Sequence, residues 1–134
     1  LNLQAMVYFS DHGEEVNEFR PFNGHAYEKV TSYMCEVPFL VWLSPDFRRM
    51  RPDLRFDLTR PYSTVDLPYT MANLAALRFQ GYDDTRSLLS PHFRPRPRRV
   101  GELPYETVLD MTRKAKERQR APSFFGSLTR RLAE

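Results

Sequence analysis

Residues 5–14 read AMVYFSDHGE, an apolar run that ends abruptly in a polar loop. β-Branched and aromatic side chains fill the first half of this stretch, which predicts a buried β-strand over residues 5–9. In open α/β sheets, ligands gather at the carboxyl ends of strands. The polar residues that follow the strand are therefore the first candidates for a binding or catalytic site.

Two of these polar residues, Asp11 and His12, have the chemistry of metal ligands. A carboxylate oxygen and an imidazole nitrogen suit zinc or a similar divalent ion, and Gly13 gives the backbone the freedom to form a tight loop. A catalytic zinc takes about three protein ligands and keeps one position open, so further ligands must come from elsewhere. On spacing alone an Asp-His pair is more often a hydrogen-bonded structural pair, and the pattern by itself does not establish a metal site.

A second strand is predicted at residues 37–43, which read VPFLVWL. It is apolar on both faces, as for a strand that helices cover on each side, and we expect Trp42 to lie in the core. One helix is predicted from Asp66 onward, with Pro68 in its first turn, and a final helix over about residues 105–120. These elements predict an α/β fold.

Charge is distributed unevenly along the 134 residues. Residues 1–46 carry seven acidic and two basic side chains, a net −5, which leaves +8 for the remainder of a chain whose total is +3. An acidic first third suits a cation site, and a basic remainder suits an anionic partner. For the basic helix and tail at the end, we weigh an anionic membrane surface against a merely solvated segment; a nucleic acid is not expected.

Other features limit the class of protein. The longest apolar run, residues 37–43, is far shorter than the ~20 residues that a membrane-spanning helix needs. The lone Cys35 has no partner for an internal disulfide and is interpreted as a buried structural thiol. The chain begins with Leu1 and not with Met, which we take as the sign of a fragment whose N-terminal part is missing.

Residues 7–16, VYFSDHGEEV, closely resemble the last metal motif of the sulfatase/alkaline-phosphatase superfamily. Further segments are similar to one branch of it, the bacterial phosphoethanolamine transferases of the lipid A and lipopolysaccharide-core type. These segments are Gly24-His25, YEK at 27–29, VPFLVWLSP at 37–45, RPY at 60–62 and YDDTRSLLSP at 82–91. The Asp-His-Gly-Glu pattern belongs to the whole superfamily, whereas the later segments point to the transferase branch.

The resemblance implies the architecture of the chain. Residues 1–104 are expected to form a partial alkaline-phosphatase-like sheet flanked by helices, the C-terminal segment of a catalytic domain. Residues 105–134 are expected to form a basic helix and tail.

The resemblance also implies roles for individual residues. Zinc would be held by Asp11 and His12 together with an upstream acid and an upstream Thr nucleophile. His25, which follows a glycine, would contact the phosphoryl group. From their position after the motif, and apart from the resemblance, Glu14 is expected to bond the loop amides or to support the metal ligands, and Glu15 to be solvated.

The implied activity is the transfer of phosphoethanolamine from phosphatidylethanolamine to lipopolysaccharide, through a covalent Thr intermediate, at the periplasmic face of the bacterial inner membrane. No threonine of this chain matches the position of that nucleophile. We therefore expect the chain alone to be inactive, with incomplete zinc ligation. Two alternatives stay open: a sulfatase or phosphodiesterase of the same superfamily, and a catalytically inert binding module with a basic contact surface.

Overall fold

The structure is a computed structural model that describes residues 1–18 and 20–120. The described residues form two compact units, one made of Leu1–Asp11 with Val37–Arg98 and the other of His12–Glu36 with residues 99–120. The basic tail, for which a membrane contact was weighed against a solvated segment, lies outside the described residues. The predicted division of the chain at residue 104 stays a prediction.

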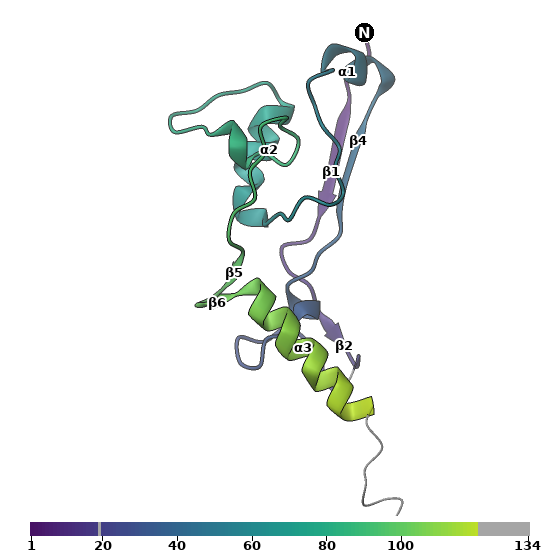
Figure 1. The fold of residues 1–134 in the computed structure, drawn as a ribbon. Helices are drawn as coiled ribbons and strands as arrows, with labels where there is room; N and C mark the ends of the chain where they lie inside the picture. The colour runs from purple at the N-terminus through teal and green to yellow at the C-terminus, as the bar shows by residue number, and fades with distance from the viewer. Residues whose placement is uncertain (19, 121–134) are drawn as a thin grey trace, which may run out of the picture. The chain divides into compact units, whose positions relative to one another are not determined.

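The first unit is built on an antiparallel pair of strands, β1 (Ala5–Phe9) and β4 (Phe39–Leu43), which run side by side in Figure 1. β1 has the predicted bounds. β4 begins two residues later than predicted, just after Pro38, which has no amide hydrogen to donate to a neighbouring strand. Val7 lies opposite Val41 in this pair.

One face of the strand pair packs into the core of the first unit. That core consists of four buried leucines, with three partly buried side chains packed against it: Leu43, Leu54, Leu74 and Leu89, then Val7, Val41 and Phe47. Full burial of a leucine side chain contributes roughly 1.5–3 kcal/mol. The leucines therefore join β4 to the helix that carries Leu74 and to the loops that carry Leu54 and Leu89.

The other face of the strand pair is exposed. Met6 lies opposite Trp42 and Tyr8 opposite Leu40, and even the least exposed of these, Trp42, shows 46% of its surface. The predictions that β1 is buried, that both faces of β4 are covered and that Trp42 lies in the core are wrong for this chain. The reason is that, among the described residues, two strands and their core make one covered face and no second layer.

Ser44 connects β4 to the helix α1 (Pro45–Met50). Its Oγ accepts a hydrogen bond from the amide of Phe47 at 3.3 Å, as the N-cap of that helix. The same hydroxyl accepts from the amide of Gln4 at 3.1 Å and donates to the carbonyl of Asn2 at 2.6 Å. Because Ser44 is only 2% exposed, these bonds form a dry clasp between the start of the chain and the end of β4.

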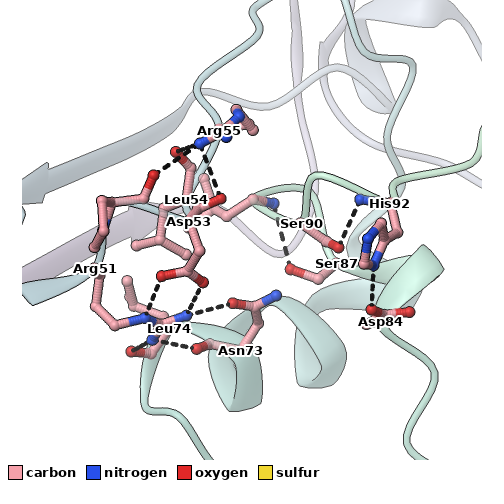
Figure 2. A network of polar contacts seen from close by, with 12 residues as sticks. Arg51, Asp53, Leu54, Arg55, Asn73, Leu74, Asp84, Ser87, Ser90 and His92 are labelled. Carbon is pink, nitrogen blue, oxygen red and sulfur yellow. Dashed lines mark hydrogen bonds and ion pairs between the residues drawn. The ribbon is translucent and has the colours of Figure 1, made fainter.

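Arg51 holds the carboxyl end of the helix α2 (Leu67–Leu74), as Figure 2 shows. Its Nη1 donates to the carbonyl oxygens of Asn73 at 2.8 Å and Leu74 at 3.1 Å. Asp53 fixes the guanidinium with two bonds of 2.9 and 2.7 Å, and the same pairing holds the pKa of Asp53 below its usual value. A cation on the last carbonyls of a helix complements the helix dipole.

The remaining elements of the first unit are short. The 3₁₀ turn η2 (Thr64–Asp66) leads into α2, which confirms the predicted helix, and η3 (Asp84–Arg86) follows it. The Arg- and Pro-rich segment 94–98 has no regular structure, as expected for residues that precede prolines. Within the described residues, no helix has the length and hydropathy needed to cross a membrane.

The second unit contains the helix α3 (Tyr105–Arg120), which has the predicted bounds and follows a hairpin of β5 (Arg99–Val100) and β6 (Leu103–Pro104). α3 packs on the 3₁₀ turn η1 (Ser32–Met34) through side chains at helical spacing, which are Val108, Thr112 and Lys116. Thr112 Oγ1 accepts from the amide of Ser32 at 2.9 Å, and Lys116 Nζ donates to the hydroxyl of Tyr33 at 2.6 Å. The basic helix therefore has an inner face that braces η1.

Candidate metal centre

Three side chains of the second unit converge: His12, Glu14 and His25. Each offers one ligand atom, and these atoms lie within 4.8 Å of one another. The ring centroids of His12 and His25 are 3.7 Å apart, and His25 Nδ1 is 3.4 Å from Glu14 Oε1. Two imidazoles and a carboxylate are the protein ligands of many catalytic zinc ions, so this donor set fits zinc.

The imidazole of His12 contacts the backbone of the next residue, Gly13. Its Nδ1 lies 3.0 Å from the carbonyl oxygen of Gly13, which only accepts hydrogen bonds, so Nδ1 carries a proton. In a neutral imidazole this leaves the lone pair on Nε2. His12 is thus held in the form in which Nε2 binds a metal, the arrangement common among histidine ligands.

Gly13 lies against the backbone around η1. Its amide donates to the carbonyl of Met34 at 3.0 Å. A Cβ atom at this position would stand 2.1 Å from the carbonyl oxygen of Tyr33 and 2.6 Å from that of Glu36. Sequence reasoning expected conformational freedom from this glycine, whereas the structure shows that it is needed for space.

Cys35 directly follows η1, in the backbone segment against which Gly13 packs. Its Sγ donates to the carbonyl of Thr31 at 3.3 Å, and its side chain is partly buried. Burial, and then the charge of Glu36, raise the pKa of this thiol above its usual value. The thiol is therefore protonated at neutral pH, which agrees with a structural role.

Glu15 is a buried anchor next to the candidate metal centre. Its side chain is 0% exposed and accepts from Arg20 Nε at 2.6 Å, from Arg20 Nη2 at 3.1 Å and from Thr31 Oγ1 at 3.0 Å. Arg20 also donates to the carbonyl of Lys29 at 3.2 Å. The prediction that Glu15 is solvated is wrong, because a bidentate arginine and a hydroxyl satisfy its charge away from water.

This anchor fixes the loop that carries His25. Glu15 lies in β2 (Glu15–Val16), which pairs with β3 (Asn23–Gly24), and Glu15 itself lies opposite Gly24. Gly24 has φ +122°, a conformation open essentially only to glycine. Glu14 precedes Glu15 and His25 follows Gly24, so the short strand pair brings Glu14 and His25 close together.

Replacing Arg20 with alanine is expected to lower the free energy of unfolding by about 2–3 kcal/mol, because the buried Glu15 carboxylate loses its charged partner. The loss stays below that of a fully buried pair, since the Arg20 side chain is 25% exposed. Urea unfolding measures the difference. The control is Arg113→Ala, which removes an exposed ion pair with Asp110 and should change stability by less than about 0.5 kcal/mol. Equal losses in both variants would contradict the role of Glu15 as an anchor.

Of the predicted site residues, the structure brings together His12, Glu14 and His25. Asp11 ends the first segment of the first unit, whereas the other three side chains belong to the second unit, so its role as a metal ligand stays a prediction. Sequence reasoning missed Glu15 and Arg20. Their spacing of five residues fits neither a helix nor a strand period, so no local pattern indicated the pair.

Comparisons with known proteins bear on this site. A family model described as Sulfatase matches residues 4–77. The chain is 40% identical over 104 residues to phosphoethanolamine transferase EptC of Escherichia coli strain K12, and equally so to phosphoethanolamine transferase CptA of Salmonella typhimurium. Each alignment covers 75% of this chain but 18% of the relative, so the chain spans less than a fifth of the length of these relatives.

The chain is also similar to solved structures of a protein of the same kind. The chain resembles the crystal structure of the C-terminal periplasmic domain of EcEptC from Escherichia coli, with a TM-score of 0.69 and 35% sequence identity. The match covers 78% of this chain and 32% of that one. A second structure of that domain, described as a complex with Zn, matches equally well.

Proposed function

This chain belongs to the sulfatase family, and we propose that it forms the C-terminal part of the catalytic domain of a phosphoethanolamine transferase. The observation that carries the proposal is the convergence of His12, Glu14 and His25 in a chain 40% identical over 104 residues to two proteins named as such transferases. The proposed location is the periplasmic face of the bacterial inner membrane. The proposed acceptor is lipopolysaccharide, at lipid A or a core sugar phosphate.

Zinc is the proposed cofactor, with Asp11 and His12 as two of its ligands. The protonated Nδ1 of His12, held by the carbonyl of Gly13, leaves Nε2 for the ion. When bound, zinc would activate a hydroxyl nucleophile and stabilise negative charge on a phosphoryl group. Glu14 Oε1 lies 3.4 Å from Nδ1 of His25, so the proposed role of Glu14 is to orient His25 beside the zinc ligands.

The proposed reaction has two transfers. A Thr hydroxyl, carried by a part of the full-length protein beyond these 134 residues, attacks the phosphorus of phosphatidylethanolamine. The bond from phosphorus to the diacylglycerol oxygen breaks, and that oxygen takes a proton. An oxygen of lipopolysaccharide then attacks the same phosphorus, the bond from phosphorus to the Thr oxygen breaks, and that oxygen takes a proton to restore the Thr hydroxyl. In both transfers His25 donates hydrogen bonds to the phosphoryl oxygens, where charge develops.

The test is transfer by the full-length protein, followed as the appearance of phosphoethanolamine on lipopolysaccharide by mass spectrometry. His12→Ala and treatment with a chelator are each expected to lower the rate at least about 100-fold. The matched control is His92→Ala, because His92 is 70% exposed and paired with Asp84 in the first unit. The 134-residue chain by itself is expected to show no transfer.

Two results would contradict the proposal. Transfer that is unaffected by His12→Ala would remove the metal centre from the reaction. Zinc-dependent hydrolysis of a sulfate ester or a phosphodiester, with no transfer to lipopolysaccharide, would assign the protein to a hydrolase of the same family.

A further inference from the structure

The carboxylate of Glu14 lies beside His25 in an open position. Glu14 Oε1 is 3.4 Å from His25 Nδ1, and the two side chains are 51% and 49% exposed. This distance is longer than the roughly 2.7–3.2 Å of an ordinary N–H···O hydrogen bond, so the contact between the two groups is loose. An exposed pair of this kind contributes little stability, and each member can therefore exchange its partner for a ligand at a small cost in free energy.

Three other glutamates of the second unit are held by the protein itself. Glu15 is buried and bonded to an arginine, Glu18 accepts from a backbone amide, and Glu36 accepts from a tyrosine hydroxyl. Within the described residues, Glu14 forms one ion pair, and its partner is His25. A carboxylate has two oxygens that accept hydrogen bonds, and this pair involves one of them. Glu14 therefore keeps the capacity to accept from a cationic ligand.

The backbone that carries Glu14 and His25 is itself fixed. Glu14 precedes Glu15 and His25 follows Gly24, and Glu15 and Gly24 lie opposite each other in the short strand pair. The bond from Arg20 to Glu15 holds this pair in place. Only side-chain torsions remain to be ordered when a ligand binds between the two groups, which limits the loss of entropy.

The chemistry of phosphoethanolamine matches this arrangement of an acceptor beside a donor. Its phosphoryl end is anionic and accepts hydrogen bonds. Its amine, two carbons from the phosphoryl ester oxygen, is protonated at neutral pH like that of lysine and offers three N–H donors. A protein that recognises both ends needs a donor for the first and an acceptor for the second. His25 and Glu14 provide one of each, 3.4 Å apart.

We infer that Glu14 binds the ammonium of the ethanolamine group while His25 contacts the phosphoryl oxygens. The inference rests on the proposed function, whose substrate it assigns to a specificity-determining residue. When the substrate binds, the loose contact between Glu14 and His25 gives way to two contacts with the ligand. Because a hydrogen bond between ionised groups is roughly twice as strong as one between neutral groups, Glu14 favours a phosphoryl group that carries an amine.

The experiment compares the binding of two small ligands to the full-length protein by isothermal titration calorimetry. The ligands are phosphoethanolamine and propyl phosphate, which has the same length but a methyl group in place of the ammonium. The unaltered protein is expected to bind phosphoethanolamine at least about tenfold more tightly. Glu14→Gln keeps the size of the side chain but removes its charge, and is expected to abolish this preference. Its affinity for propyl phosphate should stay within about threefold of that of the unaltered protein.

The matched control is Glu28→Gln, which removes the same charge from an exposed glutamate three residues after His25. It is expected to keep the preference for phosphoethanolamine. His25→Ala should weaken the binding of both ligands, because both carry the phosphoryl group. Circular dichroism and the zinc content of each variant verify that the fold and the metal centre are kept.

Four results would overturn the inference. They are equal affinities of the unaltered protein for the two ligands, a preference that survives Glu14→Gln, equal effects of Glu14→Gln and Glu28→Gln, and no binding of either ligand at about 10 mM. The transferase proposal fails by a different measurement, the absence of phosphoethanolamine on lipopolysaccharide. A protein that prefers phosphoethanolamine through Glu14 but transfers none would keep this inference and lose the proposed reaction.

Discussion

His25→Ala in the full-length protein is expected to lower the rate of phosphoethanolamine transfer by roughly 10²–10⁴-fold and to leave the zinc content unchanged. The loss follows from the proposed role of His25 as a donor to the phosphoryl oxygens, a contact that matters most where charge develops. Its imidazole is well placed for this, since it is 49% exposed and its Nδ1 lies 3.4 Å from Glu14. Metal content and rate are measured on the same sample.

The outcome separates two roles for His25 that the geometry allows. The ligand atoms of His12, Glu14 and His25 lie within 4.8 Å of one another, so His25 is also within reach of a shared metal. Loss of zinc together with activity would make His25 a ligand, with Glu14 as its neighbour in the coordination shell. Unchanged turnover would exclude both roles. His92→Ala again serves as the control for the loss of one exposed histidine.

Gly13→Ala is expected to reduce the free energy of unfolding by about 4 kcal/mol, more than almost any other single methyl group added to a protein. The added Cβ would meet the carbonyl oxygens of Tyr33 at 2.1 Å and Glu36 at 2.6 Å, and both are backbone atoms that cannot rotate away. Backbone movement there would also loosen the 3.0 Å bond from Gly13 to Met34. Urea unfolding measures the loss of stability, and zinc titration of the same variant measures any change in metal binding at the neighbouring His12.

Gly101→Ala is the control for this variant. Gly101 lies in the same unit with φ +56°, and a Cβ there has no heavy atom within 4 Å. Its replacement tests conformational strain without collision and should cost about 1 kcal/mol. Similar losses for the two variants would show that the wall around η1 yields to an added side chain.

The strongly patterned parts of the fold were predictable from the sequence. A β-branched and aromatic run predicts residues 5–9 as a strand, and a helical period predicts residues 105–120 as a helix; both occur with those bounds. The likeness to the periplasmic domain of EptC confirms the α/β, alkaline-phosphatase-like fold class. These are local signals, or ones that a family resemblance carries.

The geometry of the candidate metal centre was less predictable. β2 and β3 contain two residues each, too few for any period, yet their pairing sets Glu15 opposite Gly24. The partners of Glu15 are Arg20 and Thr31, 5 and 16 residues away, so its burial depends on how the loop closes. Composition likewise marks Trp42 as apolar but does not reveal whether a second layer covers it.

The two apolar faces of the β1–β4 pair have a consequence for strand alignment. A slip by one residue normally carries apolar side chains into water and is penalised for that reason. Here a slip of β4 would put Leu40 and Trp42 where Val41 and Leu43 now stand, and exchange one apolar face for another. Hydrophobicity therefore discriminates weakly between the native alignment and its nearest competitor.

The clasp at Ser44 supplies the discrimination that the faces lack. Its hydroxyl bonds to both Asn2 and Gln4, and its amide donates to the carbonyl of Gln4 at 2.9 Å. A shift of one residue would move this buried hydroxyl away from both partners and leave polar groups unpaired, at a cost of about 1–3 kcal/mol for each. The hydrogen bonds of one serine thus fix the register of two strands whose side chains are compatible with both the native and the shifted register.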